Sequence, residues 1–399
     1  MKAANDLGYG SVKAVIDGEK ISFPSAIVLQ RKQDLFDPIK FDDEDQEEEY
    51  MSHFLDHMDI TVSSNAVKTQ GRFLVGKAAR DSKLPLKTFD VNDMSGKSES
   101  DLAIIITLGM LAAKKVKEAW ESDEDLSSQL EEDVYMTTAL PVLEGKRDGA
   151  SERYEKRFTE TSHVVTFHNF KEPISVKLVF KAVIVALEGE TARYAISCAD
   201  GKLAASIKKD FDKHYPALAS EVGTEDLLKT PNTLLIDIGE GTTDFVVFAD
   251  GKVNFTSSTS LPLGYGNALE EAVSQLQSEK VAIGSRSELT EFVSRPVNAL
   301  SKSRQMRAKE AIRDQFGSLN DEITAAASQT LRKAASGIDL VYVMGGGSIG
   351  LADSGLREAL TEKLASFSGG IDVPVVWIAP RYAQILNAIG LKTILERVM

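Results

Sequence analysis

Residues 233–248, which read TLLIDIGEGTTDFVVF, constrain the fold of this chain more than any other stretch. Apolar residues lead into Asp237, a glycine-rich turn follows, and apolar residues resume after Asp244, a pattern that predicts a strand, a tight turn and a second strand. Gly239 and Gly241 permit positive φ angles and leave room for main-chain N–H groups to surround an anion such as phosphate. Since the two carboxylates would repel that anion, we expect a cation between them, which indicates Mg²⁺ bound with a nucleoside triphosphate.

The chain begins with a second copy of this motif. Residues 5–15 read NDLGYGSVKAV, in which Asp6, Gly8, Gly10 and Ser11 repeat the order of carboxylate, two glycines and a hydroxyl. A single hairpin of this kind is as often an ordinary turn as a phosphate loop. Two copies more than two hundred residues apart indicate a duplicated fold whose halves face each other across a phosphate.

A glycine run after a third apolar strand completes the set. Residues 340–350 read LVYVMGGGSIG. Consecutive glycines at the end of a buried strand permit the close approach of a flat ligand or of a helix N-terminus. Because an isolated glycine run is more often a turn, this one indicates a nucleotide site only together with the two hairpins. Its residues are Gly345, Gly346, Gly347 and Ser348.

In this order and spacing, the three motifs resemble the phosphate-1, phosphate-2 and adenosine motifs of the superfamily of actin, sugar kinases and heat-shock chaperones. The resemblance runs from Asp6 to the last helix and is greatest to the bacterial actin-like plasmid-segregation proteins, the ParM and Alp proteins. It implies an α/β actin-like ATPase fold, with two duplicated ribonuclease H-like domains around a nucleotide cleft. Domain I would comprise residues 1–187, with a small insertion at about 24–95 and the C-terminal helix 381–399, and domain II residues 188–380.

The same resemblance implies roles for individual residues. Asp6 and Asp237 would hold Mg²⁺, through water, and Lys13 would contact the β- or γ-phosphate. Glu188, after an expected strand, would orient the attacking water; leucine replaces the usual proline before it, so Glu190 is the alternative. Independently of the family, in-line attack on a γ-phosphate needs a polar group opposite the leaving group, although a helix dipole would also favour a carboxylate here. The expected nucleotide contacts are Gly8, Tyr9, Gly10, Ser11, Lys13, Gly239, Glu240, Gly241, Thr242, Thr243, Gly264, Glu270, Gly345, Gly346, Gly347 and Ser348; at Tyr9 the family often has a small hydroxyl residue.

The implied function is an ATPase, or a GTPase, that assembles into dynamic filaments and segregates plasmid DNA through a DNA-bound adaptor protein. Two alternatives stay open. One is an actin-like scaffold ATPase without a segregation role, and the other is a small-molecule kinase of the same superfold, in which a carboxylate would serve as base for a substrate hydroxyl. A chaperone would need a peptide-binding domain after the nucleotide domain, for which we expect too little chain.

Charge and composition limit the partners and the compartment. The formal net charge is −14 and the pI about 5.0, so we expect the surface to repel nucleic acid and anionic membranes, and any link to DNA to need the adaptor. The single cysteine, Cys198, excludes an intramolecular disulfide and fits a reducing cytoplasm. Since neither a signal-peptide core nor an apolar run of membrane-spanning length is found, we expect a soluble cytoplasmic protein.

Several segments outside the motifs allow two interpretations. The acidic run 42–49 (DDEDQEEE) is expected to be a solvated loop, with a charged flap that shapes a filament contact as the alternative. The basic helix at 303–316 is expected to present a solvated face, with a contact to adenine as the alternative. Apolar residues on one face of 391–398 favour burial against domain I over attachment to a membrane.

Three further predictions concern local structure. Residues 99–120 are expected to form a buried helix with Asp101 as its N-cap, and residues 286–335 to be helical throughout. Phe23-Pro24-Ser25 matches a family strand that follows the first hairpin, and its proline favours an edge position or a bulge.

Overall fold

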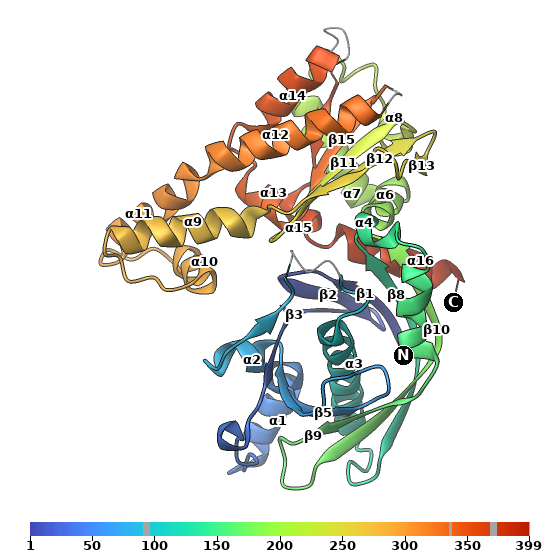
Figure 1. The fold of residues 1–399 in the computed structure, drawn as a ribbon, viewed down its shortest axis with the longest axis vertical. Coiled ribbons are helices and arrows are strands. Elements are labelled where there is room, and N and C mark those ends of the chain that lie inside the picture. The colour runs from blue at the N-terminus through green and yellow to red at the C-terminus, as the bar shows by residue number, and fades with distance from the viewer. Residues whose placement is uncertain (91–95, 335–336, 368–372, 399) are drawn as a thin grey trace. The chain divides into compact units, whose positions relative to one another are not determined.

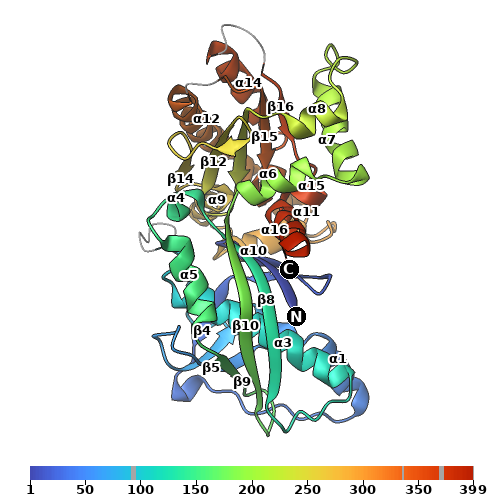
Figure 2. The ribbon, with the colours of Figure 1, turned by 90° about the vertical axis from the view of Figure 1, so that its right-hand side faces the viewer.

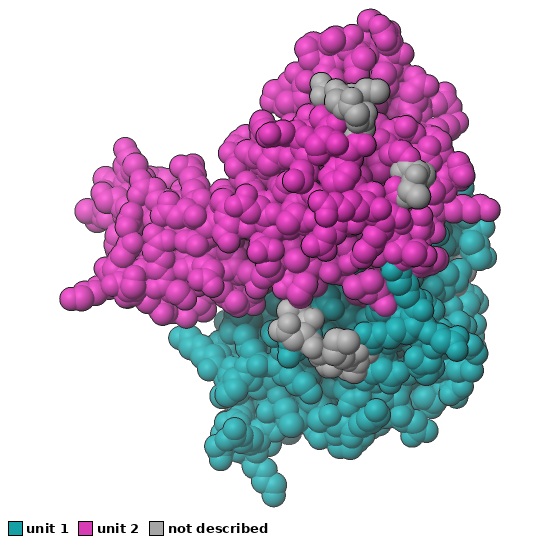
Figure 3. Space-filling model, turned by 45° about the horizontal axis from the view of Figure 1, so that its top comes forward, with its two compact units in different colours: residues 1–140, 144–191, 388–399 teal, residues 141–143, 192–387 magenta. Residues whose placement is uncertain are grey.

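The computed structural model describes residues 1–90, 96–334, 337–367 and 373–398. Its contacts divide the chain into two compact units, which Figure 3 shows in different colours. Unit 1 comprises residues 1–140, 144–191 and 388–399, and unit 2 comprises residues 141–143 and 192–387. The domain boundaries expected from the sequence stay predictions.

Unit 1 is built on a sheet that, in the described residues, has ten strands in the order β3-β2-β1-β8-β10-β9-β5-β6-β4-β7. β8 is parallel to its two neighbours β1 and β10, and all other neighbouring strands are antiparallel. The strands within the expected insertion, β4 to β7, thus continue this same sheet. The bounds are β1 (Lys2–Leu7), β2 (Ser11–Ile16), β3 (Glu19–Pro24), β4 (Ala26–Leu29), β5 (Asp59–Ser63), β6 (Arg72–Val75), β7 (Lys87–Thr88), β8 (Leu130–Leu140), β9 (His163–Phe167) and β10 (Ile174–Leu187).

Helix α3 (Asp101–Glu121) forms the centre of the core of unit 1, inside the curve of the sheet (Figure 1). Every residue from Leu102 to Ala113 is buried, as the continuous apolar run predicts. Asn5 Nδ2 of β1 donates a hydrogen bond to Thr107 Oγ1 at 3.1 Å, which fixes the first hairpin to this helix. The other helices of unit 1 are α1 (Glu44–Ser52), η1 (Lys32–Asp34), η2 (Phe54–His57), α2 (Lys77–Asp81), α5 (Ala150–Thr159) and most of α16 (Leu386–Val398), while α4 (Val142–Gly145) and α6 (Glu190–Ser197) cross into unit 2.

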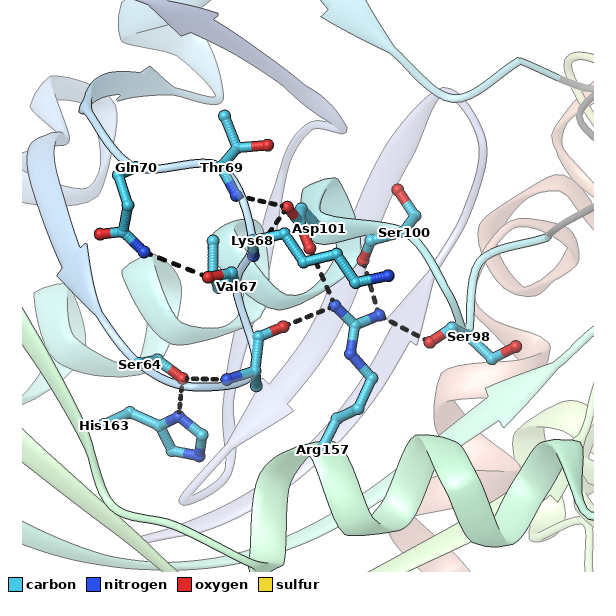
Figure 4. A network of polar contacts seen from close by, with 11 residues as sticks. Ser64, Val67, Lys68, Thr69, Gln70, Ser98, Ser100, Asp101, Arg157 and His163 are labelled. Carbon is cyan, nitrogen blue, oxygen red and sulfur yellow. Dashed lines mark hydrogen bonds and ion pairs between the residues drawn. The ribbon is translucent and has the colours of Figure 1, made fainter.

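The start of α3 differs from the prediction. Ser100, not Asp101, is the N-cap residue. The Asp101 carboxylate instead accepts hydrogen bonds from the main-chain N–H groups of Lys68 and Thr69, at 3.0 and 2.8 Å, and forms an ion pair with Arg157 at 3.1 Å (Figure 4). The prediction was wrong because a distant loop, invisible in the local pattern, competes for this carboxylate.

Two other local predictions were also wrong. The acidic run 42–49 is not a loop but lies mostly in α1, because Asp43 caps that helix by accepting a hydrogen bond from Gln46 N at 2.9 Å, and carboxylates in a first turn are favoured by the helix dipole. Of the range 286–335, which was expected to be helical throughout, the described residues 286–334 form three helices rather than one continuous run, since Pro296 lies in the break after the first of them.

The C-terminal helix and Pro24 follow the sequence-based predictions. Leu391 and Leu395 of α16 are buried and form a small cluster with Ala4, Val15 and Ala139 of unit 1. Pro24 is the last residue of β3, which is an edge strand. No helix in the described ranges is long and apolar enough to cross a membrane.

Unit 2 contains a smaller sheet with the order β13-β12-β11-β15-β16, and β14 also pairs with β12. Helices α12 and α14 lie on one side of this sheet, and α7 and α8 lie on the other (Figure 2). The strands are β11 (Thr233–Ile238), β12 (Thr243–Ala249), β13 (Lys252–Val253), β14 (Thr259–Leu261), β15 (Leu340–Met344) and β16 (Val375–Trp377). The helices are α7 (Gly201–His214), α8 (Thr224–Lys229), α9 (Tyr265–Ser278), α10 (Arg286–Ser294), α11 (Lys302–Asp314), α12 (Phe316–Lys333), α13 (Gly346–Gly350), α14 (Leu356–Phe367) and α15 (Pro380–Ala383).

The two sheets repeat one topology. In each unit an antiparallel run of three strands, β3-β2-β1 or β13-β12-β11, continues into two parallel strands, β8-β10 or β15-β16. Each predicted phosphate hairpin joins the corresponding pair, β1 to β2 and β11 to β12. The duplication predicted from the two sequence motifs is therefore present in the strand order itself.

Candidate functional site

The first hairpin turn, between β1 and β2, is fixed by hydrogen bonds to its carbonyl oxygens. Gly8 N donates to Ser11 O at 3.1 Å, while Ser25 donates twice, from Oγ to Gly8 O at 2.7 Å and from N to Gly10 O at 3.1 Å. A Cβ atom at Gly8 would lie 2.8 Å from Ser11 O, so the turn needs glycine there. Ser25, the last residue of the Phe23-Pro24-Ser25 match, therefore holds the predicted phosphate loop in shape.

Asp6 and Lys13 face this turn from neighbouring strands of the hairpin. Asp6 is buried, with an exposed fraction of 5%. Burial raises the pKa of its carboxyl group, and the positive charges of Lys13 and Lys97 oppose that rise. Lys13 Nζ lies 3.7 Å from the position of a Cβ at Gly8, so the ammonium group reaches the turn. A buried carboxylate beside lysines suits a site that binds a cation together with an anion.

Glu188 follows the last residue of β10, as the sequence predicted, and its main-chain N donates to Leu140 O at 2.8 Å. Its carboxylate forms an ion pair with Lys97, whose Nζ lies 2.6 Å from Glu188 Oε1. The exposed fractions of the two side chains are only 12% and 2%. Glu190 begins α6, and it is exposed.

Lys97 also contacts Tyr9 of the first turn. Its Nζ lies 4.6 Å from the centroid of the Tyr9 ring, and Tyr9 packs edge-on against Phe89. Burial alone would lower the pKa of the Lys97 ammonium, but the negative charges of Glu188 and Asp6 and the hydrogen bond to Glu188 outweigh this effect and raise the pKa above its ordinary value. Lys97 therefore stays a cation and joins the predicted phosphate loop to the predicted catalytic glutamate.

The segment that carries Lys97 is held from two sides. The Glu144 carboxylate accepts hydrogen bonds from the main-chain N–H groups of Lys97 and Ser98, at 3.0 and 2.7 Å. Arg157 donates to the carbonyl oxygens of Ser98 and Ser100, at 2.6 and 3.0 Å (Figure 4). Sequence analysis missed Lys97, because a lone lysine in an irregular loop has no periodicity and its ionic partner is 91 residues away.

The second hairpin turn, between β11 and β12, repeats the main-chain bond of the first. Gly239 N donates to Thr242 O at 2.8 Å, in the place of the bond from Gly8 to Ser11. Two N–H groups at the start of α9 then close this turn from the other side, Tyr265 N to Gly239 O at 3.0 Å and Gly266 N to Glu240 O at 2.8 Å. At Gly264 a Cβ atom would lie 2.7 Å from Glu240 O, which explains the glycine in the segment LPLGYGN.

Hydroxyl and carboxylate groups of the second hairpin already have partners within unit 2. Thr242 Oγ1 donates to Asp244 Oδ2 at 3.2 Å. Thr243 is fully buried and its Oγ1 donates to Leu263 O at 2.8 Å, so this hydroxyl supports the turn. Asp237 Oδ2 accepts from Asn387 Nδ2 at 3.0 Å.

The glycine run packs directly against the second turn. Gly345 has φ +90°, and a Cβ atom there would collide with Asp237 Oδ1 and Ile238 O. A Cβ atom at Gly347 would lie 2.7 Å from Tyr265 Cβ, and one at Gly346 2.9 Å from Gln384 Nε2. Ser348 is buried, and its Oγ donates to Gly345 O at 2.7 Å. The run therefore brings the end of β15, the second turn and the start of α9 into contact.

Arg286, which sequence analysis also missed, joins two of the predicted nucleotide contacts. Its guanidinium group lies 3.7 Å from Glu240 Oε1 and 3.3 Å from Glu270 Oε1, beside the start of α9. As the first residue of α10, it could not be placed from the sequence, because nothing there indicates how α10 packs on α9.

The predicted site residues thus form one group in each unit. The group in unit 1 is Asp6, Gly8, Tyr9, Gly10, Ser11, Lys13 and Glu188, to which the structure adds Lys97. The group in unit 2 is Asp237, Gly239, Glu240, Gly241, Thr242, Thr243, Gly264, Glu270, Gly345, Gly346, Gly347 and Ser348, to which the structure adds Arg286.

The duplicated strand order and the paired hairpins define an α/β protein with an actin-type fold. Residues 4–189 match a family model described as "Actin like proteins N terminal domain", and residues 235–357 match one described as "Archaeal actin homologue MreB-like, C-terminal". The chain belongs to the actin-like proteins. A comparison with curated proteins finds no match.

Solved structures of actin-like proteins share this fold over the full length. The crystal structure of the actin-like protein Alp7A aligns with a TM-score of 0.67 at 18% identity, covering 99% of this chain and 96% of that one. Bacillus thuringiensis ParM with ATP aligns at 0.60 and 16% identity, covering 100% and 99%. Ta0583, an archaeal actin homologue solved in complex with ADP, aligns at 0.59 and 18% identity, covering 99% of each chain. The predicted fold class is confirmed.

Proposed function

We propose that this chain binds a nucleoside triphosphate through both hairpin turns, hydrolyses it and uses the cycle to assemble and disassemble filaments. The observation that carries the proposal is the repeated turn, in which Gly8 N bonds Ser11 O and Gly239 N bonds Thr242 O, each just after a strand that carries an aspartate. Main-chain N–H groups of glycine-rich turns bind phosphate oxygens in many nucleotide sites.

Asp6 and Asp237 are the residues that would hold Mg²⁺. In the described residues no group of three or more His, Cys, Asp or Glu side chains is placed to hold a metal ion. Mg²⁺ needs no such group, because it keeps several waters and is usually bound by one or two carboxylates and the phosphates. Asp6 is buried, so a cation bound there would stabilise its ionised form and would also neutralise charge on the phosphates.

Glu188 is the residue that would orient the attacking water. The ion pair with Lys97 holds the Glu188 carboxylate in a fixed position. The same Lys97 ammonium group lies over the ring of Tyr9 in the phosphate turn. A carboxylate so placed can accept a proton from water as the water attacks the terminal phosphorus, while main-chain donors and Lys13 stabilise the charge on the phosphate oxygens. The nucleotide is ATP or GTP.

The proposed biological role is plasmid segregation through a DNA-binding adaptor. It rests on the likeness to the proteins named ParM and Alp7A. The charge of −14 supports an adaptor, because a surface of that charge would repel DNA. We place the protein in the cytoplasm, where nucleotide and plasmid are both present.

Right-angle light scattering after addition of Mg-ATP or Mg-GTP tests this function, with sedimentation to confirm polymer. We expect a rapid rise above a critical protein concentration, followed by decay as nucleotide is consumed. Turnover of nucleotide without any rise, at every protein concentration, would contradict the filament and would favour a kinase or a non-polymerising scaffold.

A further inference from the structure

A groove in unit 1 lies beside the acidic helix α1 and outside the predicted nucleotide contacts. Its volume is about 440 Å³, within the range of protein binding pockets. Its apolar and aromatic wall includes Ile39, Phe41, Tyr50 and His57. We call it the α1 groove; its remaining lining residues are Lys40, Gln46, Glu49, His53, Asp56 and Lys77.

The walls of the α1 groove are held in place by contacts within unit 1. Tyr50 and His57 stack with ring centroids 4.2 Å apart, and Asn169 Nδ2 donates both to Tyr50 OH, at 2.9 Å, and to His57 O, at 2.6 Å. Lys77 and Asp56 form an ion pair at 2.7 Å on the rim. The groove is therefore preformed, which reduces the entropy cost of filling it.

Negative charge borders this groove. Residues 42–49, which cover the start of α1 and the two residues before it, include seven carboxylates. Within the described part of the chain, none of the seven takes part in an ion pair. Six of them are exposed, and Glu47 is partly exposed. A partner of the α1 groove should therefore offer an apolar side chain flanked by cations.

Unit 2 carries a segment of that chemistry. Residues 295–309, which we call the basic arm, contain five lysines or arginines and no acidic residue. Leu300 has an exposed fraction of 93%, far above that of a core leucine, and Val297 and Met306 are exposed by 57% and 53%. Gln305 fixes the arm by donating to Phe292 O and Arg295 O, at 2.9 and 3.1 Å.

Much of the charge of the basic arm is not neutralised. Arg295 pairs with Glu291 and Arg307 pairs with Glu279 and Glu310, whereas Lys302, Arg304 and Lys309 form no ion pair with any described residue. Exposed apolar side chains between unpaired cations mark a contact surface rather than a solvated helix face alone.

We propose that the α1 groove of one copy of this chain receives the basic arm of a second copy, with Leu300 in the groove and Arg304 and Lys309 along the acidic helix. The two surfaces belong to different units, so the contact is heterologous. A copy whose groove is occupied can still insert its own basic arm into the groove of a further copy. Such a contact does not close on itself unless it forms a ring, and it builds an open filament. The inference rests on the proposed filament function and names one of its interfaces.

Charge reversal on each side tests the contact. The groove variant carries Glu44→Lys and Glu48→Lys, and the arm variant carries Arg304→Glu and Lys309→Glu; all four side chains are exposed. For each variant alone, we expect the critical protein concentration for assembly with Mg-nucleotide to rise about 10-fold, because like charges then face each other across the contact. A mixture of equal amounts should assemble at nearly the wild-type concentration, since the reversed groove fits the reversed arm. Leu300→Ser should also impair assembly.

A matched control is Glu358→Lys with Glu362→Lys, which makes the same charge change at the same spacing on α14 and should leave assembly unchanged. Failure of the mixture to assemble would overturn the inference, as would unimpaired assembly of either variant alone. Assembly restored only when all four changes are in one chain would place the contact within one molecule and overturn the second copy as occupant.

Sedimentation velocity without nucleotide separates this inference from the proposed function. We expect a complex between the groove and arm variants and none in either variant alone. If the wild type turns over nucleotide but does not polymerise, the filament function fails, and this measurement still decides whether the groove receives the arm.

Discussion

Replacing Glu188 with glutamine is expected to lower nucleotide hydrolysis by about 10²- to 10⁴-fold, the usual contribution of a positioned acid or base. Glutamine keeps the shape of the side chain but cannot accept the proton of the attacking water. Because the phosphate turns are untouched, affinity for Mg-nucleotide should change little, although the variant also leaves the buried Lys97 ammonium without its carboxylate partner and should be less stable than the wild type. The measurement is single-turnover phosphate release, with calorimetric affinity beside it.

Glu190→Gln is the matched control for this substitution. Glu190 is two residues away and exposed, and we expect near wild-type hydrolysis from it. In light scattering, filaments of the Glu188→Gln variant should form and then persist, because the decay needs hydrolysis. Normal hydrolysis by Glu188→Gln, with loss in Glu190→Gln, would assign the water to Glu190 instead.

Lys97→Met is expected to destabilise unit 1 by about 3–5 kcal/mol, the usual cost of leaving one charge of a buried ion pair without its partner. Both side chains are nearly enclosed, and methionine fills the space of the lysine stem without its charge. The loss of stability comes from the buried charge of Glu188, which is left without its partner, and from that of Asp6, which Lys97 also compensates. Urea denaturation followed by circular dichroism measures it.

A double-mutant cycle gives this second prediction its control. Lys97→Met with Glu188→Gln removes both charges, so it should recover a large part of the stability lost in Lys97→Met alone. Lys156→Met, which breaks an exposed ion pair with Glu152, should leave stability unchanged. If Lys97→Met lowered the free energy of unfolding no more than Lys156→Met does, Lys97 would not be the partner that holds Glu188.

The parts of this protein that were predictable from sequence are those whose signal is local. Each hairpin is specified by alternating apolar residues and a glycine turn within about a dozen residues, and the pairing of β1 with β2 and of β11 with β12 follows that pattern. The buried helix α3 was predictable for the same reason, from one continuous apolar run. The repeated strand order then agrees with the repeated motif.

What sequence analysis missed depends on contacts between distant segments. Lys97 is a functional candidate only because the end of β10 brings Glu188 to it, and Arg286 only because α10 packs beside the start of α9. Asp101 was assigned to its own helix because a local pattern cannot show that the N–H groups of a distant loop would reach it. The bond from the Thr243 hydroxyl to Leu263 O could not be foreseen either, because its acceptor lies 20 residues away in the chain; the contact of Thr243 with phosphate stays a prediction.

Isothermal titration calorimetry with Mg-ADP, on the wild type and on Asp6→Asn and Asp237→Asn, tests most directly whether both hairpins bind one nucleotide. We predict one nucleotide per chain, an affinity about 10-fold weaker in each variant, equal to about 1.4 kcal/mol, and no change in the surface control Asp353→Asn. Removal of Mg²⁺ should weaken the wild type and reduce the difference between it and the variants. Absence of binding by the wild type, or binding that depends on only one of the two aspartates, would contradict a site built from both turns.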